Sequence, residues 1–168
     1  SWEVINENDD TMYYSIGGHP AFRVPENPKE SRDQYWLEFP GKEHLEYLLL
    51  NPQNGLAATG TTYDLKLRGG CYPIEEHLFD RDALVFEGGQ IGEVRIDRPD
   101  KTPYVTLRCA GFPFVGIWSK PDGAFVCLEP WMGRTDDDGF TGDLAEKIGV
   151  ESLKARENRM YTYGIEFH

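Results

Sequence analysis

Residues 104–109 read YVTLRC, and apolar and polar side chains alternate along this segment. Val105 and Leu107 point to one side of an extended chain, whereas Thr106 and Arg108 point to the other. This period of two predicts a strand with one face packed in a core and the other in water.

The same period recurs from residue 160 to residue 168, which we expect to close the domain as a strand. Short apolar runs occur at 35–39 and 84–86, separated by many of the 18 glycines and 11 prolines. These features predict an all-β fold, an antiparallel β-sandwich. The apolar face of the closing strand would carry Tyr161, Tyr163, Ile165 and Phe167.

Two segments have a weak helical pattern. They are residues 43–50 and residues 142–153, where Asp143 could cap a turn that carries Leu144 and Ile148. We predict a helix in each.

The acidic run Asp136-Asp137-Asp138 stands directly before Gly139. Like charges beside a glycine favour a solvated turn. Carboxylates in this arrangement could also bind a cation or the hydroxyls of a sugar. We expect the turn.

The chain has no internal repeat, low-complexity tract or obvious linker. Its 168 residues lie within the range of one domain, which buries about two thirds of its unfolded surface. We therefore expect a single domain over residues 1–168.

The balance of charges bears on possible partners. The formal net charge is -12, which provides no basic surface for a phosphate backbone, so we expect no nucleic acid. No apolar run approaches the roughly 20 residues that a membrane-spanning helix needs. The first residues lack the basic and apolar regions of a secretory signal, so we expect a cytoplasmic protein.

The cysteines and histidines show no metal-binding or disulfide pattern. The three cysteines are widely spaced, and we expect buried, apolar roles for them. No histidine pair has zinc-ligand spacing, so we expect no metal and no cofactor. The residues concerned are Cys71, Cys109 and Cys127, and His19, His44, His77 and His168.

The segment YSIGGHPAF contains His19 between two glycines and a proline. The glycines permit close approach of the backbone, and Pro20 stiffens the chain after the histidine. His19 is therefore an oriented side chain, either as a catalytic group or simply as part of a turn.

The segment FVCLEPW places Glu129 on the same strand face as Phe125 and Cys127. A carboxylate is costly at an apolar position, and burial there would raise its pKa. Two interpretations remain open: Glu129 is a functional acid or base, or it is a strand-end carboxylate paired with Arg134.

Several separated motifs together resemble the aldose 1-epimerase (galactose mutarotase) family, in its LacX-like branch. They are GGHPAF, HLFDRDALVF, GFPFVGIWS, CLEPW followed by GRTD, and EKIGVESL. The resemblance covers almost the whole chain. It implies part of a large antiparallel β-supersandwich that binds a monosaccharide, and an isomerase that acts in carbohydrate metabolism.

The resemblance also implies roles for individual residues. His19 matches the histidine that protonates the ring oxygen of the sugar, and Glu129 matches the carboxylate base. An acidic residue that binds sugar hydroxyls is expected at Asp80 or Asp82.

Further sugar contacts are expected from aromatic side chains and from the GRTD motif. Aromatic walls would bring the pKa values of acid and base together and would stack on the sugar. The candidates are Phe22, Trp118, Trp131 and Arg134. For Trp131, packing in the core is an equally open interpretation.

Family members are typically near twice this length. We therefore expect that residues 1–168 correspond to the carboxy-terminal half. The apolar surface and sheet edges that such a half exposes predict pairing with the amino-terminal half or with a second copy.

Two other classes of protein compete with a mutarotase. A non-catalytic carbohydrate-binding β-sandwich would keep Trp131 and the acidic residues without needing an acid opposite a base. A hydrolase would need two carboxylates about 5–9.5 Å apart, and only Glu129 has a distinctive context. The scattered positions of Arg23, Arg108 and Arg134 favour a neutral sugar over a phosphosugar.

Overall fold

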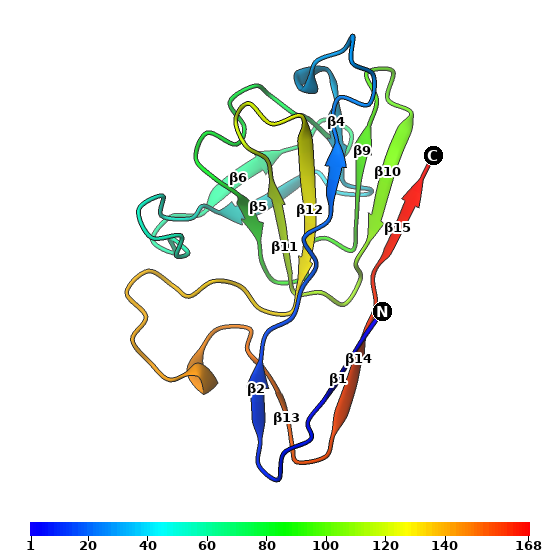
Figure 1. Cartoon of the computed structure of the whole chain (residues 1–168). Helices are drawn as coiled ribbons and strands as arrows, with labels where there is room; N and C mark the ends of the chain where they lie inside the picture. The colour runs from blue at the N-terminus through cyan, green and yellow to red at the C-terminus, as the bar shows by residue number, and fades with distance from the viewer.

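Two antiparallel sheets pack face to face in the computed structural model, which describes residues 1–168 (Figure 1). The six-stranded sheet has the order β3 (Ala21–Arg23), β12 (Phe125–Trp131), β11 (Phe114–Trp118), β8 (Leu84–Phe86), β5 (His44–Leu48) and β6 (Tyr63–Lys66). The five-stranded sheet has the order β15 (Gly164–Phe167), β10 (Pro103–Arg108), β9 (Glu93–Asp97), β4 (Trp36–Glu38) and β7 (Cys71–Pro73). The predicted all-β sandwich is confirmed.

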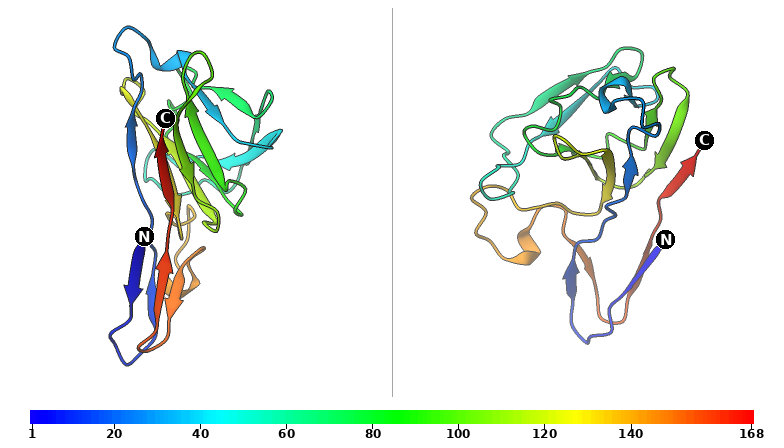
Figure 2. Two further views of the ribbon diagram at one scale, coloured as in Figure 1. Left: turned by 90° about the vertical axis from the view of Figure 1, so that its right-hand side faces the viewer. Right: turned by 45° about the horizontal axis from the view of Figure 1, so that its top comes forward.

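Two ribbons of two strands each extend beyond the sandwich (Figures 1 and 2). They pair β1 (Trp2–Ile5) with β14 (Asn158–Tyr161), and β2 (Met12–Tyr14) with β13 (Glu151–Leu153). Each ribbon joins an early strand to a late one. Apolar side chains remain exposed on them, including Ile5, Tyr13 and Met160.

The main core lies between the two sheets. Val105 and Leu107 of β10 are fully buried there, as the alternation in YVTLRC predicts. Thr106 is also buried, although its face was expected to be in water. Strand β15 pairs with β10 at this point, and the Thr106 hydroxyl is 2.9 Å from Nε2 of His168, the residue that follows β15.

The closing segment is two strands and not one. β14 and β15 belong to different sheets, and the chain leaves regular strand structure at residues 162 and 163. Tyr161 is buried, whereas Phe167 is 66% exposed, so the apolar face predicted for residues 160–168 is only partly packed.

The helix predicted over residues 43–50 is wrong, because strand β5 occupies His44–Leu48. It pairs with β6 on one side and β8 on the other. The rings of Tyr47 and Tyr63 stack across that pairing with centroids 5.4 Å apart. Leu45 and Leu48 are spaced for a helix, but in the strand they pack on opposite faces of the sheet.

The helix predicted over residues 142–153 is reduced to one 3-10 turn, η2 (Leu144–Glu146). The Asp143 backbone N–H donates to the Glu146 carboxylate, so the predicted cap position is used. Leu144 and Ile148 stay about half exposed, and without an apolar face to pack on, a longer helix gains nothing. The other helix, η1, is also a single turn (Arg32–Gln34). Neither helix approaches the roughly 20 apolar residues that a membrane-spanning helix needs.

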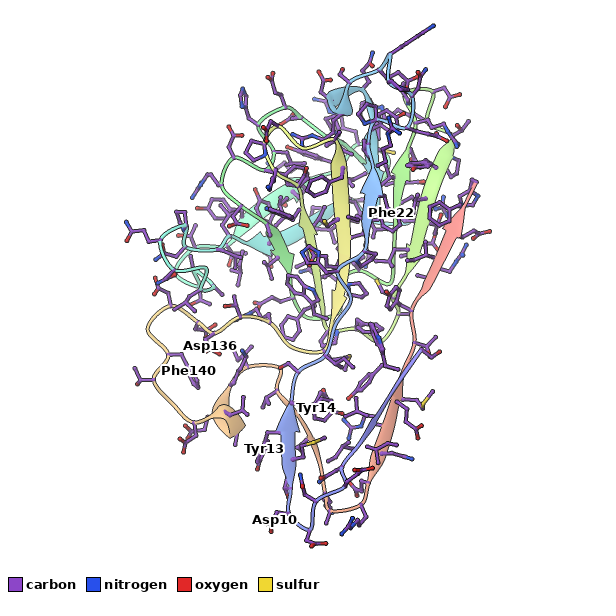
Figure 3. The ribbon with its side chains drawn as sticks, in the orientation of Figure 1. Asp10, Tyr13, Tyr14, Phe22, Asp136 and Phe140 are labelled. Carbon is purple, nitrogen blue, oxygen red and sulfur yellow. The ribbon has the colours of Figure 1, made fainter.

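The acidic run lies in the loop that follows β12, where Figure 3 labels Asp136, and each of its three carboxylates has a partner. Asp136 pairs with Lys147 at 2.9 Å, and Asp137 pairs with Arg134 at 2.7 Å. Asp138 accepts hydrogen bonds from the side-chain amides of Asn51 and Asn54. The turn is therefore held in place by two ion pairs and by hydrogen bonds from side-chain amides.

Candidate active site

Strand β12 divides its side chains between the core and the opposite face of the six-stranded sheet. Val126 and Leu128 are buried in the main core. Cys127 and Glu129, which alternate with them, point to the other face. On that face His19 meets Glu129.

The GGHP segment runs beside β12, in the same register with β12 as strand β3. Ala21 is paired with Cys127, and Gly17 forms an isolated bridge with Trp131. His19 lies midway between these two pairings, so it stands opposite Glu129. The His19 Nδ1 atom is 3.0 Å from Oε1 of Glu129.

The glycines of this segment are needed because the backbone approaches β12 closely. A Cβ atom on Gly17 would lie 2.6 Å from the Trp131 ring, and the Gly18 N–H donates to the Pro130 carbonyl at 3.0 Å. Larger residues at Gly17 would push the segment away from β12. Gly17 therefore permits the close approach of the backbone that the sequence predicts.

The two members of the pair differ in environment. The side chain of His19 is 61% exposed, whereas that of Glu129 is 6% exposed. Burial raises the pKa of Glu129 to about 7, the hydrogen bond from Trp131 opposes this shift, and the charge of Asp82 adds to it. Glu129 therefore exchanges its proton near neutral pH, which suits a general acid or base.

Aromatic side chains border the pair. The rings of His19 and Trp118 meet edge to face with centroids 6.1 Å apart. Trp118 and Trp131 pack on a small apolar cluster of this face, formed by Leu48, Ala83 and Val85. Beside Trp131 opens a cavity of about 380 Å³, within the range of small-ligand pockets.

Gly116 provides a test of this packing, because the Trp131 ring lies directly over it. A Cβ atom on Gly116 would come within 2.4 Å of two ring atoms. Gly116→Ala is expected to displace the ring and to cost about 1–3 kcal/mol of stability. Chemical denaturation measures the loss. Gly60→Ala is the control, because a Cβ atom on Gly60 meets nothing and its φ is not positive, so an equal loss of stability in that variant would contradict the interpretation.

The structure distinguishes the two acidic candidates. Asp82 lies close enough to Glu129 for its charge to raise the pKa of that carboxyl. Asp80 points elsewhere and lies 2.8 Å from His77 Nδ1. Asp82 also has a left-handed φ of 74°, and its carboxylate accepts the N–H of Ala83. Only Asp82 is brought to the pair.

Two other candidates are placed away from the pair. Phe22 of β3 is paired with Val126, so its side chain points into the main core, on the opposite face from Glu129. Arg134 lines the cavity beside Trp131, but its side chain is only 1% exposed. Its guanidinium pairs with Glu87 at 2.6 Å and with Asp137, and not with Glu129, so the alternative of a simple Glu129–Arg134 pair does not hold.

Cys127 lies at this site, which the sequence analysis did not predict. It was expected to be a buried apolar residue, and it is 1% exposed. Its thiol nevertheless belongs to a cluster with His19 and Glu129. The alternation Cys-x-Glu on one strand was the available signal.

Comparison with protein-family models gave no match. Among curated proteins, the plasmid and chromosomal forms of LacX from Lactococcus lactis subsp. lactis are each 27% identical over 166 residues. That alignment covers 98% of this chain and 56% of LacX.

Solved structures give a consistent result. A galactose mutarotase related enzyme from Lactobacillus acidophilus superposes with a TM-score of 0.87 at 28% identity, over 99% of this chain and 55% of its own. A galactose mutarotase-like protein from Lactobacillus casei gives 0.83 at 25% identity, over 99% of this chain and 57% of its own. The half-length matches fit the predicted carboxy-terminal half. The resemblance is therefore confirmed: the chain has the fold of galactose mutarotase-like proteins, is similar to LacX, and spans about half the length of the relatives it matches.

Proposed function

We propose that this site interconverts the α and β anomers of a hexose, as an aldose 1-epimerase does. Glu129 is the base and His19 is the acid. The observation that carries the proposal is the contact of 3.0 Å between a buried carboxylate and an exposed imidazole on one face of the sheet.

The reaction needs such a neighbouring pair. The anomeric hydroxyl and the ring oxygen are both bonded to C1, so the groups that act on them must be adjacent. Glu129 removes the proton of the hydroxyl while His19 donates one to the ring oxygen. The bond between C1 and the ring oxygen breaks, and the open-chain aldehyde forms. Rotation about C1–C2 and reversal of the proton transfers close the ring as the other anomer.

The surroundings favour a neutral sugar. Trp118 and Trp131 offer aromatic faces to the C–H surface of a ring, and Asp82 offers a carboxylate to its hydroxyls. A phosphosugar would need free basic side chains. Arg134 is already engaged by Glu87 and Asp137.

The length of the relatives bears on how active the isolated chain is. We propose that residues beyond this half complete the sugar site, so that the chain alone is a weaker catalyst than a full-length relative. The exposed apolar side chains Ile5, Tyr13, Met160 and Phe167 support pairing with the amino-terminal half or with a second copy.

The test is the rate at which pure α-glucose and α-galactose reach anomeric equilibrium, followed by polarimetry or NMR exchange. We expect the chain to accelerate both and His19→Asn to lose most of the acceleration. His77→Asn is the matched control, because His77 is an exposed histidine that also contacts a carboxylate. Saturable sugar binding without acceleration, in this chain and in a form with the amino-terminal half restored, would support the carbohydrate-binding module instead.

A further inference from the structure

Three side chains at the site have the donor atoms that zinc takes in proteins. One ligand atom each from His19, Cys127 and Glu129 lies within 4.8 Å of the other two. Imidazole nitrogen, thiolate sulfur and carboxylate oxygen are the usual zinc ligands. The three come from two adjacent segments, β12 and the residues that lead into β3, and this backbone pairing fixes their proximity.

The thiol of Cys127 has no partner within the protein. Cys71 and Cys109 each donate a weak hydrogen bond to a backbone carbonyl, from Gly69 and Ile91 respectively. Cys127 makes none, although its side chain is 1% exposed and faces the His19–Glu129 pair. A buried thiol without a partner, beside two further ligand atoms, is a donor available to an ion.

We propose that His19, Cys127 and Glu129 bind a soft divalent cation such as Zn²⁺, and that the bound ion blocks the sugar reaction. Exposed His19 provides the entry path, and solvent supplies the fourth ligand. On binding, the Cys127 thiol gives its proton to solvent and a sulfur–metal bond forms. One thiolate and one carboxylate together balance the two positive charges of the ion, which reduces the cost of burying it.

The block follows from the identity of the ligands and rests on the proposed function. A lone pair that is bonded to the metal is not available to accept or deliver a proton. Both the acid and the base are therefore withdrawn at once. Sugar and zinc are expected to compete, since both need the same two side chains.

Binding is tested on the full chain with ZnCl₂ in calorimetry and with CoCl₂ in absorption spectroscopy. We expect one ion per chain and a sulfur-to-cobalt charge-transfer band in the near ultraviolet. Cys127→Ser and Cys127→Ala are each expected to weaken zinc binding by at least roughly tenfold, the loss typical even of outer-shell changes, and to abolish the band. Cys71→Ser and His77→Asn are the controls, since Cys71 is another thiol and His77 is another histidine beside a carboxylate.

The outcomes separate the metal site from the enzymatic proposal. Zinc binding that is unchanged in both Cys127 variants would overturn the site and would point to the exposed pairs His44–Asp64 and His77–Asp80. Zinc binding lost in those variants supports the site even if the chain does not act on sugars. Anomerisation that zinc leaves unaffected at saturation would overturn the block.

Discussion

Glu129→Gln is expected to slow anomerisation by roughly 10²–10⁴-fold, the usual contribution of a general acid or base. The amide keeps the size and the hydrogen-bonding position of the carboxyl but cannot accept the proton of the anomeric hydroxyl. Sugar binding should change little, so the loss is expected in kcat and not in KM. The measurement is the rate constant for equilibration of α-glucose over a range of sugar concentrations.

The pH dependence follows from the pKa of about 7 that burial gives Glu129. The base acts only as a carboxylate, so activity is expected to rise as the pH increases through about 7. The contribution of Glu129 to stability has the opposite pH dependence. The pKa is raised above its usual 4.5, so the stability that Glu129 contributes is present below about pH 4.5 and is lost as the pH rises through about 7.

Asp97→Asn is the matched control for Glu129→Gln. Asp97 is 2% exposed on β9 of the other sheet, and burial raises its pKa to about 6. Either substitution is expected to raise the free energy of unfolding at pH 8 relative to wild type, by up to about 3 kcal/mol. Only Glu129→Gln should reduce anomerisation. Full activity in Glu129→Gln, or equal losses in both variants, would remove Glu129 as the base.

Arg32→Met is expected to destabilise the fold by about 3 kcal/mol or more. The Arg32 side chain comes from η1, is nearly buried, and donates hydrogen bonds to the loop between β11 and β12 and to a second loop. Its acceptors are the Ser119 hydroxyl and the carbonyls of Glu76, Lys120, Pro121 and Gly123. Methionine replaces the apolar stem but leaves these acceptors without a donor. Urea denaturation measures the loss.

Arg32→Lys distinguishes hydrogen-bond geometry from charge at this position. An ammonium group carries the same charge but lacks the planar fork that reaches several carbonyls at once. We expect it to recover only a small part of the stability. A lysine variant as stable as wild type would show that charge alone is sufficient.

The strands were predictable where side-chain alternation and sheet position agree. Val105 and Leu107 of β10 face the core, and their positions follow from the alternation in the sequence. The structure of residues 43–50 does not follow from the sequence. Leu45 and Leu48 pack on opposite faces of one sheet, and their spacing of three residues also fits one face of a helix. Pairing with β6 and β8 settles the choice, and both partner strands lie outside residues 43–50.

In the site as well, the features that depend on nearby residues were predictable, and those that depend on the path of the folded chain were not. His19 and Glu129 were singled out by local context and by resemblance, and the fold brings them into contact. The choice between Asp80 and Asp82 depends on a turn with a left-handed residue, which the sequence HLFDRDALVF does not specify. Phe22 was expected to be an aromatic wall of the sugar site, but it lies an odd number of residues from His19, so its side chain points to the other side of the strand.

The pairing of β3 with β12 has a consequence for the order of folding. β3 is an edge strand whose sole partner in the sheet is β12. During synthesis, the GGHP segment therefore cannot pair until β12, which lies late in the chain, has been made. Strands β5, β6 and β8 can associate before β3 has its partner. Pairing between strands that are far apart in sequence, such as β3 and β12, is slow. The acid and the base therefore meet only when this long-range pairing forms, and activity is expected to appear later in refolding than the pairing of strands that are close in sequence, such as β5 with β6.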